Sequence, residues 1–550
     1  MPGMATTGGR LIMSILRNAL CWSVTTVSVV AACAVSISAD ASAAPATPYR
    51  AVVHGLAPQM HRAAAAATHA PISTRSRGAR QHVTSATSAG PATASGAVAA
   101  AAGTLLQNFN GVGSRDSEVT NFNLRFEPPD QGLCAGNGFI IEPVNSAYSI
   151  YTSSGKVLRG PFNVNDLFNE GAAEFTSDPR CYYDASTHTW FATILFLNDT
   201  FTSGHLDIAV NNTGDPTGLW KQYQINTDDL GGNGCPCFGD QPRMGIDKDN
   251  IYVSTDEFSI NGPEFNGGQI YAIAKSDLIN ENSSAHFVHF AGLSSGGALV
   301  DSIQPALTNG SSPAEFFLNS LDPNATFDHR LGVWALTHGD VVATGGTPTL
   351  TTKVITSEAY GMPPGAEQKG SSSTLDSGDD RMQQTQFING QIWGELTTGV
   401  TIPGDSEQRA GAAWFAVRPS LSNGRLSGAV IDRQGYVVKK GNYLLYPALQ
   451  ADASGRAAMV FTLTGANRFP SAAYAVLPSS GNVFGPATVA AAGTGRYDPN
   501  AGRWGDYSFA VLNPSRDAVW LATEYIPPVS SQTSNRQRNW GTRVFQVGLS

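Results

Sequence analysis

The chain has 550 residues, of which 14% are charged, with 58 glycines and a formal net charge of -9. Such a length can bury a large core, and the acidic balance argues against nucleic acid as a partner. After the N-terminal region no stretch approaches ~18 uninterrupted apolar residues, so we predict no membrane span.

The first 43 residues read as a secretory signal peptide. Arg10 and Arg17 form a basic start, residues 20–37 are mostly apolar, and Ala41-Ser42-Ala43 fits a small-residue cleavage site. This predicts a secreted protein, periplasmic or extracellular. A second interpretation is that Val30-Ala31-Ala32-Cys33 is a lipoprotein box, in which Cys33 would carry a lipid anchor.

Residues 44–104 differ sharply in composition from the rest of the chain. They are rich in Ala, Ser, Thr and Pro, contain arginines and histidines, and have no acidic residue. Too few large apolar side chains are present to offset the entropy of ordering. We therefore predict a disordered linker or a cleaved propeptide.

The remaining residues, 105–550, have the pattern of an all-β domain. Apolar runs typical of strands recur at residues 139–144, 190–196, 251–254, 269–273, 391–395, 413–417, 459–463, 472–476 and 519–522. Turn signals such as Asn389-Gly390, Asn423-Gly424 and Ser454-Gly455 separate them, and long helical periodicity is absent.

A repeated phrase suggests how these strands are organised. Tyr183-Asp184 is followed after five residues by Trp190, and Tyr497-Asp498 after five residues by Trp504. A unit repeated near both ends of a strand-rich chain favours a ring of similar sheets closed by its termini. The fold prediction is a β-propeller of six or seven blades, with a jelly roll or a multi-domain β-sandwich as the alternative.

Four cysteines follow the predicted signal peptide: Cys134, Cys181, Cys235 and Cys237. An even count in an exported chain indicates disulfides. We favour a bond between Cys134 and Cys181, which leaves Cys235-Pro236-Cys237 as a local bridge or a redox pair. A zinc or copper site is less well supported, because no second cysteine or histidine pair accompanies the Cys-x-Cys spacing.

Several motifs, taken in order, resemble a known group of proteins. They are Pro128-Pro129-Asp130, Gly136-Asn137-Gly138, Val144-Asn145, Ser177-Asp178-Pro179, Tyr183-Asp184, Gly239-Asp240-Gln241-Pro242-Arg243 and Arg503-Trp504-Gly505-Asp506-Tyr507. Together they resemble large secreted bacterial β-propellers related to the sialidase-like (BNR repeat) superfamily. The resemblance covers nearly all of residues 105–550 and implies a propeller, in a superfamily that includes glycosidases, polysaccharide lyases and binding proteins. Sialidase activity itself is not expected, because the Phe-Arg-Ile-Pro motif and an intact Asp-box are missing.

Three segments place an arginine close to a Gly-Asp pair, and these arginines are Arg243, Arg381 and Arg503. If each segment opens a different blade, the guanidinium groups could converge and bind an acidic sugar or another carboxylate. Nearby carboxyl groups would then supply general acid and base, and the candidates are Asp240, Glu257, Asp379 and Asp506. Tyr507 could act as nucleophile or proton donor if a neighbouring base lowered its pKa.

Structural roles compete with these catalytic ones. An aspartate in a turn commonly caps its own backbone, which is the role we favour for Asp184 and Asp498, with Trp190 and Trp504 as core residues. No cofactor is predicted, although the acidic turns at residues 247–250 and 376–380 leave calcium open.

Two functions remain. One is a glycan-active enzyme, a glycoside hydrolase or polysaccharide lyase, acting as a monomer on an extracellular polysaccharide or glycoconjugate. The other is a non-catalytic binding or adhesion propeller that grips its partner with aromatic residues such as Trp220, Tyr223 and Trp540. Arginines and carboxylates sharing one concave site would favour the enzyme, whereas arginines buried and paired between blades would favour binding.

Overall fold

The computed structural model describes residues 53–60 and 103–549, apart from residues 124–125, 172–173, 199, 229–233, 322–327, 498–502, 516 and 529–538. The predicted signal peptide, Cys33 and most of the predicted linker lie outside these described residues. Eight of the nine apolar runs singled out in the sequence lie within strands, and the ninth, residues 139–144, ends one residue after its strand. In strands such as β8 (Thr189–Leu197) and β26 (Ala457–Gly465) every residue is buried, because sheets cover both of their faces.

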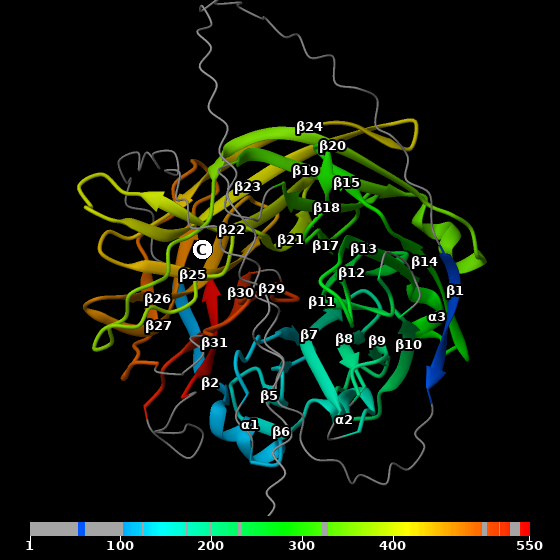
Figure 1. The fold of residues 1–550 in the computed structure, drawn as a ribbon, viewed down its shortest axis with the longest axis horizontal. Coiled ribbons are helices and arrows are strands. Elements are labelled where there is room, and N and C mark those ends of the chain that lie inside the picture. The colour runs from blue at the N-terminus through cyan, green and yellow to red at the C-terminus, as the bar shows by residue number, and fades with distance from the viewer. Residues whose placement is uncertain are drawn as a thin grey trace, which may run out of the picture. The chain divides into compact units, whose positions relative to one another are not determined.

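The strands form seven four-stranded antiparallel sheets, so the fold is a seven-bladed β-propeller, as predicted (Figure 1). Blade 1 contains β3 (Cys134–Gly136), β4 (Phe139–Pro143), β5 (Ala147–Thr152) and β6 (Val157–Asn163). Blade 2 contains β7 (Phe175–Asp184), β8, β9 (Gly204–Asn211) and β10 (Lys221–Asn226). Blade 3 contains β11 (Cys237–Ile246), β12 (Asn250–Ser259), β13 (Phe265–Ala274) and β14 (Ser284–Phe290). Blade 4 contains β17 (Gln304–Asn309), β18 (Glu315–Ser320), β19 (Asp328–Thr337) and β20 (Thr349–Tyr360).

The last three blades include the one that closes the ring. Blade 5 contains β21 (Met382–Ile388), β22 (Gln391–Thr401), β23 (Gln408–Ser422) and β24 (Arg425–Val437). Blade 6 contains β25 (Tyr443–Ala451), β26, β27 (Arg468–Leu477) and β28 (Thr488–Ala491). Blade 7 contains β29 (Phe509–Leu512), β30 (Ala518–Tyr525) and β31 (Gly541–Gly548), and its fourth strand is β2 (Thr104–Gly113). In Figure 1 the blue β2 lies beside the red β31, so the two ends of the folded chain share one blade.

The first strand of each blade is its innermost, and these inner strands run parallel to one another around the axis. β17 pairs in parallel with both β11 and β21. The core consists of layers between neighbouring blades, and seven tryptophans are fully buried in it: Trp190, Trp334, Trp393, Trp414, Trp504, Trp520 and Trp540. The predicted core positions of Trp190 and Trp504 are therefore confirmed.

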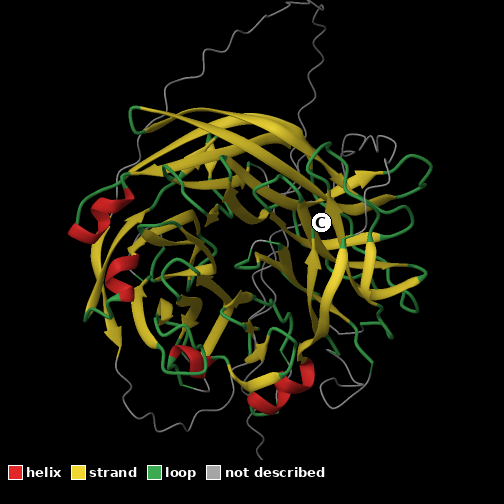
Figure 2. Ribbon diagram, turned by 180° about the vertical axis from the view of Figure 1, so that it is seen from behind, coloured by secondary structure: helices red, strands yellow, loops and turns green. Residues whose placement is uncertain are grey.

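A few short elements lie outside the blades. They are α1 (Ser114–Thr120), α2 (Asn165–Phe168), α3 (Lys275–Ile279), the 3-10 helix η1 (Gly339–Thr344), and the small hairpin of β15 (Ser294–Ser295) and β16 (Ala298–Leu299). Figure 2 shows the helices at the periphery of the ring. Among the described residues, none of the helices has the length and apolar character needed to span a membrane.

One strand lies within the segment predicted to be disordered. β1 (Val53–Met60) pairs antiparallel with β14 and, at its end, with β10. The outer strands of blades offer unpaired backbone groups, which can bind an additional strand whatever its composition. These eight residues therefore differ from the expectation for residues 44–104.

The repeated Tyr-Asp-Trp phrase does not mark equivalent positions. In blade 2 it spans the β7–β8 hairpin, where Tyr183 pairs with Trp190 and their rings lie 4.5 Å apart. Tyr497 and Trp504 also contact each other, with ring centroids 5.0 Å apart, but they belong to the connection between β28 and β29. The prediction of a closed ring is correct, although the phrase that suggested it is not the blade repeat.

Disulfide bonds link Cys134 to Cys181 and Cys235 to Cys237, as favoured from the sequence. The first joins the inner strands of blades 1 and 2. A loop of this length, with a sequence separation of 47, is expected to restrict the unfolded chain and stabilise the fold by about 4 kcal/mol.

We therefore predict that a Cys134→Ser, Cys181→Ser variant loses about 4 kcal/mol of unfolding free energy in urea titrations. The Cys235→Ser, Cys237→Ser variant is the control. It removes a bond that closes a much shorter loop, so its loss of unfolding free energy should be smaller. Equal losses in the two variants would contradict the role of the first bond as the main covalent tie between blades.

The closure of blade 7 buries a carboxyl group. Glu142, on β4, is completely buried and accepts a 2.7 Å hydrogen bond from the backbone nitrogen of Val112 in β2. Burial raises the pKa of Glu142 from 4.5 to about 7, although hydrogen bonds from Thr542 and Val112 oppose the shift. Between pH 4.5 and 7 the native state therefore holds a proton that the unfolded chain has lost, and stability falls as pH rises through this window.

Replacing Glu142 by Gln removes this titration. Between pH 4.5 and 7 the variant is expected to lose about 3 kcal/mol less unfolding free energy than the wild type. Glu281→Gln, at a half-exposed side chain, is the control and should behave as wild type. An unchanged pH dependence in the Glu142 variant would show that the buried carboxyl does not ionise in this range.

Candidate functional site

Polar side chains from six of the seven blades gather near the N-terminal ends of the inner strands, and we call this set the polar ring. Its members are Asp130, Asp178, Arg180, Asp240, Gln241, Arg243, Asp301, Ser302, Asp379, Arg381, Arg503 and Asp506. All except Arg503 are buried, and the Arg503 side chain is 24% exposed. The sequence segments that predicted three converging arginines therefore all contribute to one region.

The backbone of the polar ring repeats an unusual conformation. Asp130, Asp178, Gln241 and Ser302 all have φ between 46° and 59°, and Tyr446 in blade 6 has φ 49°. Non-glycine residues adopt this left-handed region at a cost of ~1 to 2 kcal/mol each. Such costs are retained mainly where a precise side-chain position matters, including functional sites.

Arg243 is the most buried arginine of the ring. Its side chain is 1% exposed and forms an ion pair of 2.7 Å with Asp256 on the neighbouring strand β12. Its Nη2 also donates to Gln241 Oε1 at 2.7 Å and to Ser302 Oγ at 2.9 Å. These contacts connect blades 3 and 4.

Arg381 and Arg503 continue the network toward blade 7. Arg381 Nη1 donates to the same Gln241 Oε1 at 2.8 Å, and its Nε donates to Asp379 Oδ1 at 2.7 Å. Arg381 Nη2 also lies 4.0 Å from Asp506 Oδ1, whereas Arg503 Nη2 donates to Asp506 Oδ2 at 2.6 Å. The three predicted arginines are thus linked through Gln241 and Asp506.

The opposite side of the ring is acidic. Asp130, Asp178 and Asp506 come from blades 1, 2 and 7, and one carboxylate oxygen of each lies within 4.8 Å of the others. The backbone nitrogen of Asp506 donates to Asp130 Oδ1 at 2.8 Å. Asn145 connects Asp130 to Asp178. Its Nδ2 donates to Asp130 Oδ2 at 2.8 Å, and its Oδ1 accepts from the backbone nitrogen of Asp178.

The electrostatics of this acidic side favour a protonated carboxyl group. Burial raises the pKa of Asp130 well above its usual value, and the nearby carboxylates of Asp506 and Asp178 raise it further, whereas Arg503 lowers it. Burial likewise raises the pKa of Glu524, which faces Asp130 and Asp506 from β30. Asp130, whose protonated form these shifts favour, therefore lies beside Asp506, which is ion-paired with Arg503.

The pKa of Tyr507 is raised, whereas a role as nucleophile would need a neighbouring base that lowers it. Its ring is buried beneath Arg180, whose guanidinium carbon lies 3.3 Å from the ring centroid, and its Oη lies 3.4 Å from the backbone oxygen of Pro179. Burial raises the pKa of Tyr507 well above its ordinary value, despite the nearby charge of Arg180. The phenol is therefore held protonated in a packing role between blades 2 and 7.

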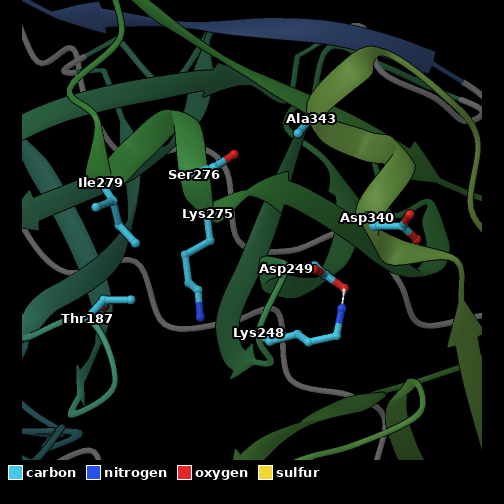
Figure 3. Close-up of a pocket in the computed structure, with 8 residues that line it drawn as sticks. All are labelled: Thr187, Lys248, Asp249, Lys275, Ser276, Ile279, Asp340 and Ala343. Atoms are coloured by element: carbon cyan, nitrogen blue, oxygen red, sulfur yellow. Dashed lines mark hydrogen bonds and ion pairs between the residues drawn. The ribbon is translucent and has the colours of Figure 1, made fainter.

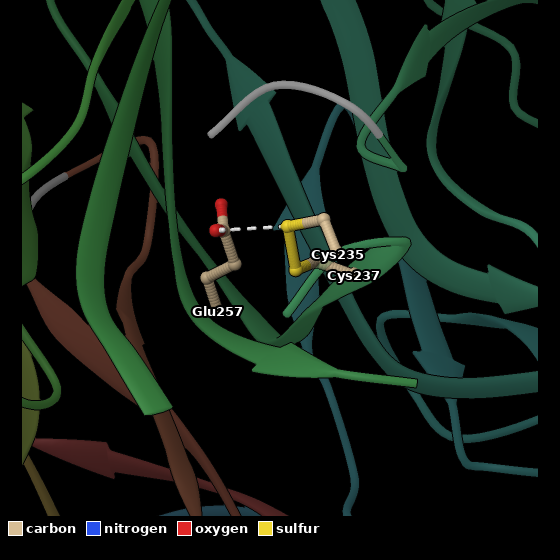
Figure 4. Close-up of side chains that lie close together, drawn as sticks. All are labelled: Cys235, Cys237 and Glu257. Carbon is tan, nitrogen blue, oxygen red and sulfur yellow. Dashed lines mark hydrogen bonds between the residues drawn. A yellow bond between two sulfur atoms is a disulfide. The ribbon is translucent and has the colours of Figure 1, made fainter. Parts of the chain in front are cut away.

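Glu257 lies apart from the arginines. Its neighbour in the chain, Asp256, contacts Arg243, and successive residues of a strand point to opposite faces. Figure 4 shows the Glu257 carboxyl beside the Cys235–Cys237 disulfide, 3.9 Å from Cys235 Sγ. Burial raises the pKa of Glu257, and Asn266 donates a hydrogen bond of 3.1 Å to it. Asp240, in contrast, lies on β11 opposite Asp256, within the polar ring.

The far ends of the inner strands carry turn-capping aspartates. Asp184 accepts hydrogen bonds from the backbone and side chain of Ser186 and from Thr187 Oγ1, which confirms the capping role predicted for it. Asp498 lies outside the described residues. Asp247 accepts from the backbone nitrogens of Asp249 and Asn250, so its contacts are also those of a turn cap.

These turns border a depression of about 260 Å³, shown in Figure 3. It is lined by Thr187, Lys248, Asp249, Lys275, Ser276, Ile279, Asp340 and Ala343. Lys275 lies 3.0 Å from Asp184, and Lys248 contacts Asp249 at 2.6 Å. Thr187, Lys248 and Asp249 follow the inner strands β7 and β11, and the other lining residues belong to α3 and η1, which follow β13 and β19. The depression therefore lies at the ends of the blades opposite the polar ring.

The aromatic residues proposed to grip a partner have other roles. Tyr223 and Trp540 are fully buried, and each donates a hydrogen bond to a backbone oxygen, of Asn282 and Phe126 respectively. Trp220 is partly buried, and its Nε1 donates to Pro216. The first two cannot contact a ligand in this conformation.

Sequence reasoning did not assign roles to Asp130, Asp178 and Gln241, which link the ring. All three have the left-handed conformation: Asp130 lies shortly before β3, whereas Asp178 and Gln241 lie at irregularities within β7 and β11. The signal in the sequence is an Asp or Gln next to Pro or Gln, in Asp130-Gln131, Asp178-Pro179 and Gln241-Pro242. Comparing these positions between blades would have found them.

No family model matches the chain, and no curated protein matches it either. Among solved structures, it is similar to the Penicillium chrysogenum alpha-L-arabinanase complexed with arabinobiose, with 9% identity, a TM-score of 0.37 and coverage of 81% of this chain and 99% of that one. The GH93 alpha-L-arabinofuranosidase of Fusarium graminearum with arabinobiose has 8% identity, a TM-score of 0.33 and coverage of 81% and 98%. Drosophila Plexin A in complex with Semaphorin 1b has 9% identity, a TM-score of 0.34 and coverage of 82% and 88%. The predicted relation to the sialidase-like superfamily remains a prediction, and the function proposed below is based on this chain's own residues.

The burial of Arg243 gives a direct test of its structural role. Arg243→Met leaves the Asp256 carboxylate buried without its cation, so we expect a loss of 3 to 5 kcal/mol, as is roughly typical of broken buried pairs. Arg418→Met is the matched control, because Arg418 also pairs with a carboxylate at 2.7 Å but is 62% exposed. Its expected loss in urea unfolding is below ~1 kcal/mol. Similar losses in both variants would contradict a buried, charge-balanced network.

Proposed function

We propose that the protein is a glycan-active enzyme, most specifically a glycoside hydrolase, with its reactive groups on the acidic side of the polar ring. The observation that carries this proposal is the cluster of Asp130, Asp178 and Asp506, which come from three blades. In it, a carboxyl with a strongly raised pKa lies beside one that is bonded to Arg503. Carboxyl pairs with such different environments supply an acid and a base to the same reaction.

Hydrolysis of a glycosidic bond fits this pair of groups. Asp130, whose raised pKa favours the protonated form, would donate its proton to the leaving oxygen while the Asp506 carboxylate attacks the anomeric carbon. Water activated by Asp130 would then hydrolyse the glycosyl–Asp506 intermediate and free the sugar. The spacing of their oxygens, within 4.8 Å, is nearer to the ~5 to 5.5 Å of retaining enzymes than to the ~6.5 to 9.5 Å of inverting ones. We therefore propose retention of configuration at the sugar.

Arg503 is the arginine best placed to bind substrate. About a quarter of its side chain is exposed, whereas Arg243 and Arg381 are buried. A guanidinium at the edge of the ring suits an acidic sugar, since arginine binds carboxylates through paired hydrogen bonds. Arg243 and Arg381 would then position Gln241 and Asp506 and would not contact substrate.

An extracellular polysaccharide or glycoconjugate is the proposed substrate class. Two disulfides are present, and such bonds persist mainly in oxidising compartments outside the cytosol. This agrees with the signal peptide predicted from the sequence and with a secreted protein.

A non-catalytic binding propeller is the second candidate. The observation in its favour is that Arg243 and Arg381 are buried and bonded to groups of the protein itself. In that case the polar ring would hold the blades together, and a glycan would bind at its edge without reaction.

The experiment is a screen of the full-length protein on acidic and neutral polysaccharides, in which product release and retention on the polymer are followed together. Asp506→Asn and Asp130→Asn are each expected to lower product release by about 10² to 10⁴-fold, the usual contribution of a general acid or base. Activity of the wild type should also fall as pH rises past the raised pKa of Asp130, because the acid must be protonated.

Asp184→Asn is the matched control, since Asp184 is an aspartate that caps a turn at the opposite ends of the inner strands. It should retain wild-type activity. Retention on the polymer without products, unchanged by either ring variant, would reject the enzyme in favour of the binding propeller.

A further inference from the structure

A second group of titratable side chains lies in blade 2, on its outer strands. His205 and Asp207 are two residues apart on β9 and so point to the same face of the sheet. Gln224 on β10 pairs directly with Asp207. Glu170, which follows α2, completes the group, which we call the blade 2 cluster.

The polar atoms of the blade 2 cluster converge on one point. His205 Nε2 lies 3.1 Å from Asp207 Oδ1 and 3.3 Å from Glu170 Oε1. Gln224 Nε2 lies 2.8 Å from the same Glu170 oxygen and 3.0 Å from His205 Nε2. Glu170 Oε1, His205 Nε2 and one oxygen of Asp207 all lie within 4.8 Å of one another.

Protein groups alone satisfy this convergence poorly. His205 Nε2 faces carboxyl oxygens of Asp207 and Glu170 and the amide nitrogen of Gln224. It would have to donate a hydrogen to the oxygens but accept one from the amide, and a single ring nitrogen cannot do both. The Asp207 side chain is 0% exposed, yet neither of its oxygens has an aligned hydrogen-bond donor. A buried carboxylate is costly when its nearest positive group, here His205 at 3.1 Å, is poorly aligned to donate a hydrogen bond to it.

The spacing of these atoms matches the coordination shell of a small cation. A tetrahedral site with bonds of ~2.0 to 2.1 Å has donor atoms ~3.3 Å apart, and octahedral sites have slightly closer donors. The four separations in the cluster run from 2.8 to 3.3 Å. Rotation of the Gln224 amide by half a turn would present its oxygen in place of its nitrogen.

We propose that the blade 2 cluster binds a divalent transition-metal ion through His205 Nε2, Asp207, Glu170 and the Gln224 amide oxygen. One imidazole nitrogen with carboxylate oxygens is a donor set suited to Zn²⁺ or Mn²⁺, whereas Ca²⁺ and Mg²⁺ prefer oxygen alone. The ion would replace the proton of His205 as the positive charge beside Asp207.

Bound metal would fasten the segment after α2 to the outer strands of blade 2. The His205 and Glu170 side chains are 16% and 12% exposed, so the site can be reached from solvent. Phe196 stacks on the His205 ring at 4.0 Å and holds the orientation of the imidazole. The cluster shares no residue with the polar ring, so this proposal does not depend on the proposed function.

Zn²⁺ is the probe for the test. Chelator-treated full-length protein is titrated with zinc by calorimetry, and its thermal unfolding is followed with and without zinc. We expect one ion per chain and a rise in unfolding temperature on binding. Asp207→Asn keeps the shape of the side chain and removes its charge, and it should weaken zinc binding at least about tenfold. Without metal, this variant should be as stable as the wild type or more so, because it removes a buried charge.

Two further variants make the result decisive. Glu170→Gln, at a partly exposed position, should also weaken binding. His286→Ala should bind zinc as the wild type does, because His286 contacts only one carboxylate, that of Asp277 at 2.8 Å. Absence of a one-to-one zinc complex in the wild type, or equal affinity in the wild type, Asp207→Asn and Glu170→Gln, would overturn the proposal.

Discussion

Closing seven sheets into a ring brings all inner strands to one axis, and the rest of the structure depends on satisfying the polar groups gathered there. A buried backbone group left without a partner costs ~1 to 3 kcal/mol. Glutamine side chains of one blade donate hydrogen bonds to backbone oxygens of another. Gln131 donates to that of Tyr507 in blade 7, Gln304 to that of Met382 in blade 5, and Gln386 to that of Leu449 in blade 6. These side chains add to the backbone pairing that joins β17 to its neighbours β11 and β21.

The same constraint governs the charges of the polar ring. Each buried arginine must find a carboxylate or amide, and the partners often come from a different blade, as Gln241 does for Arg381. In blades 3 and 5 the two arginines, Arg243 and Arg381, are held by Asp256 and Asp379. On the side of blades 1, 2 and 7, burial first, and then the carboxylates of Asp506 and Asp178, raise the pKa of Asp130. Ring closure thus places two carboxyl groups in different environments beside one partly exposed arginine, Arg503.

The strands were predictable because the second and third strands of a blade are covered on both faces, so they read as unbroken apolar runs such as residues 190–196 and 459–463. Local chemistry was predictable as well, as the turn cap of Asp184 illustrates. Contacts between blades were not, because Asp130 and Asp506 are 376 positions apart and only ring closure joins them. Glu257 was a candidate because it follows a predicted strand, yet it lies beside the disulfide, while its neighbour Asp256 contacts Arg243.

The proposed functions occupy separate parts of the molecule. The proposed glycan site belongs to the polar ring, and the blade 2 cluster lies on outer strands. A metal bound there would therefore act on the rigidity of the blade and not on the proposed reacting groups. This separation follows from the propeller, in which every blade offers its own edges and loops while sharing one axis.

Hydrogen–deuterium exchange of the wild-type protein, with and without a polysaccharide that it retains or cleaves, tests the central claim most directly. We expect slower exchange at residues 128–131, 177–180 and 503–507, which contain Asp130, Asp178 and Asp506 of the polar ring. Protection confined to the opposite turns, around Thr187, Lys248 and Lys275, with no change at those three segments, would contradict it.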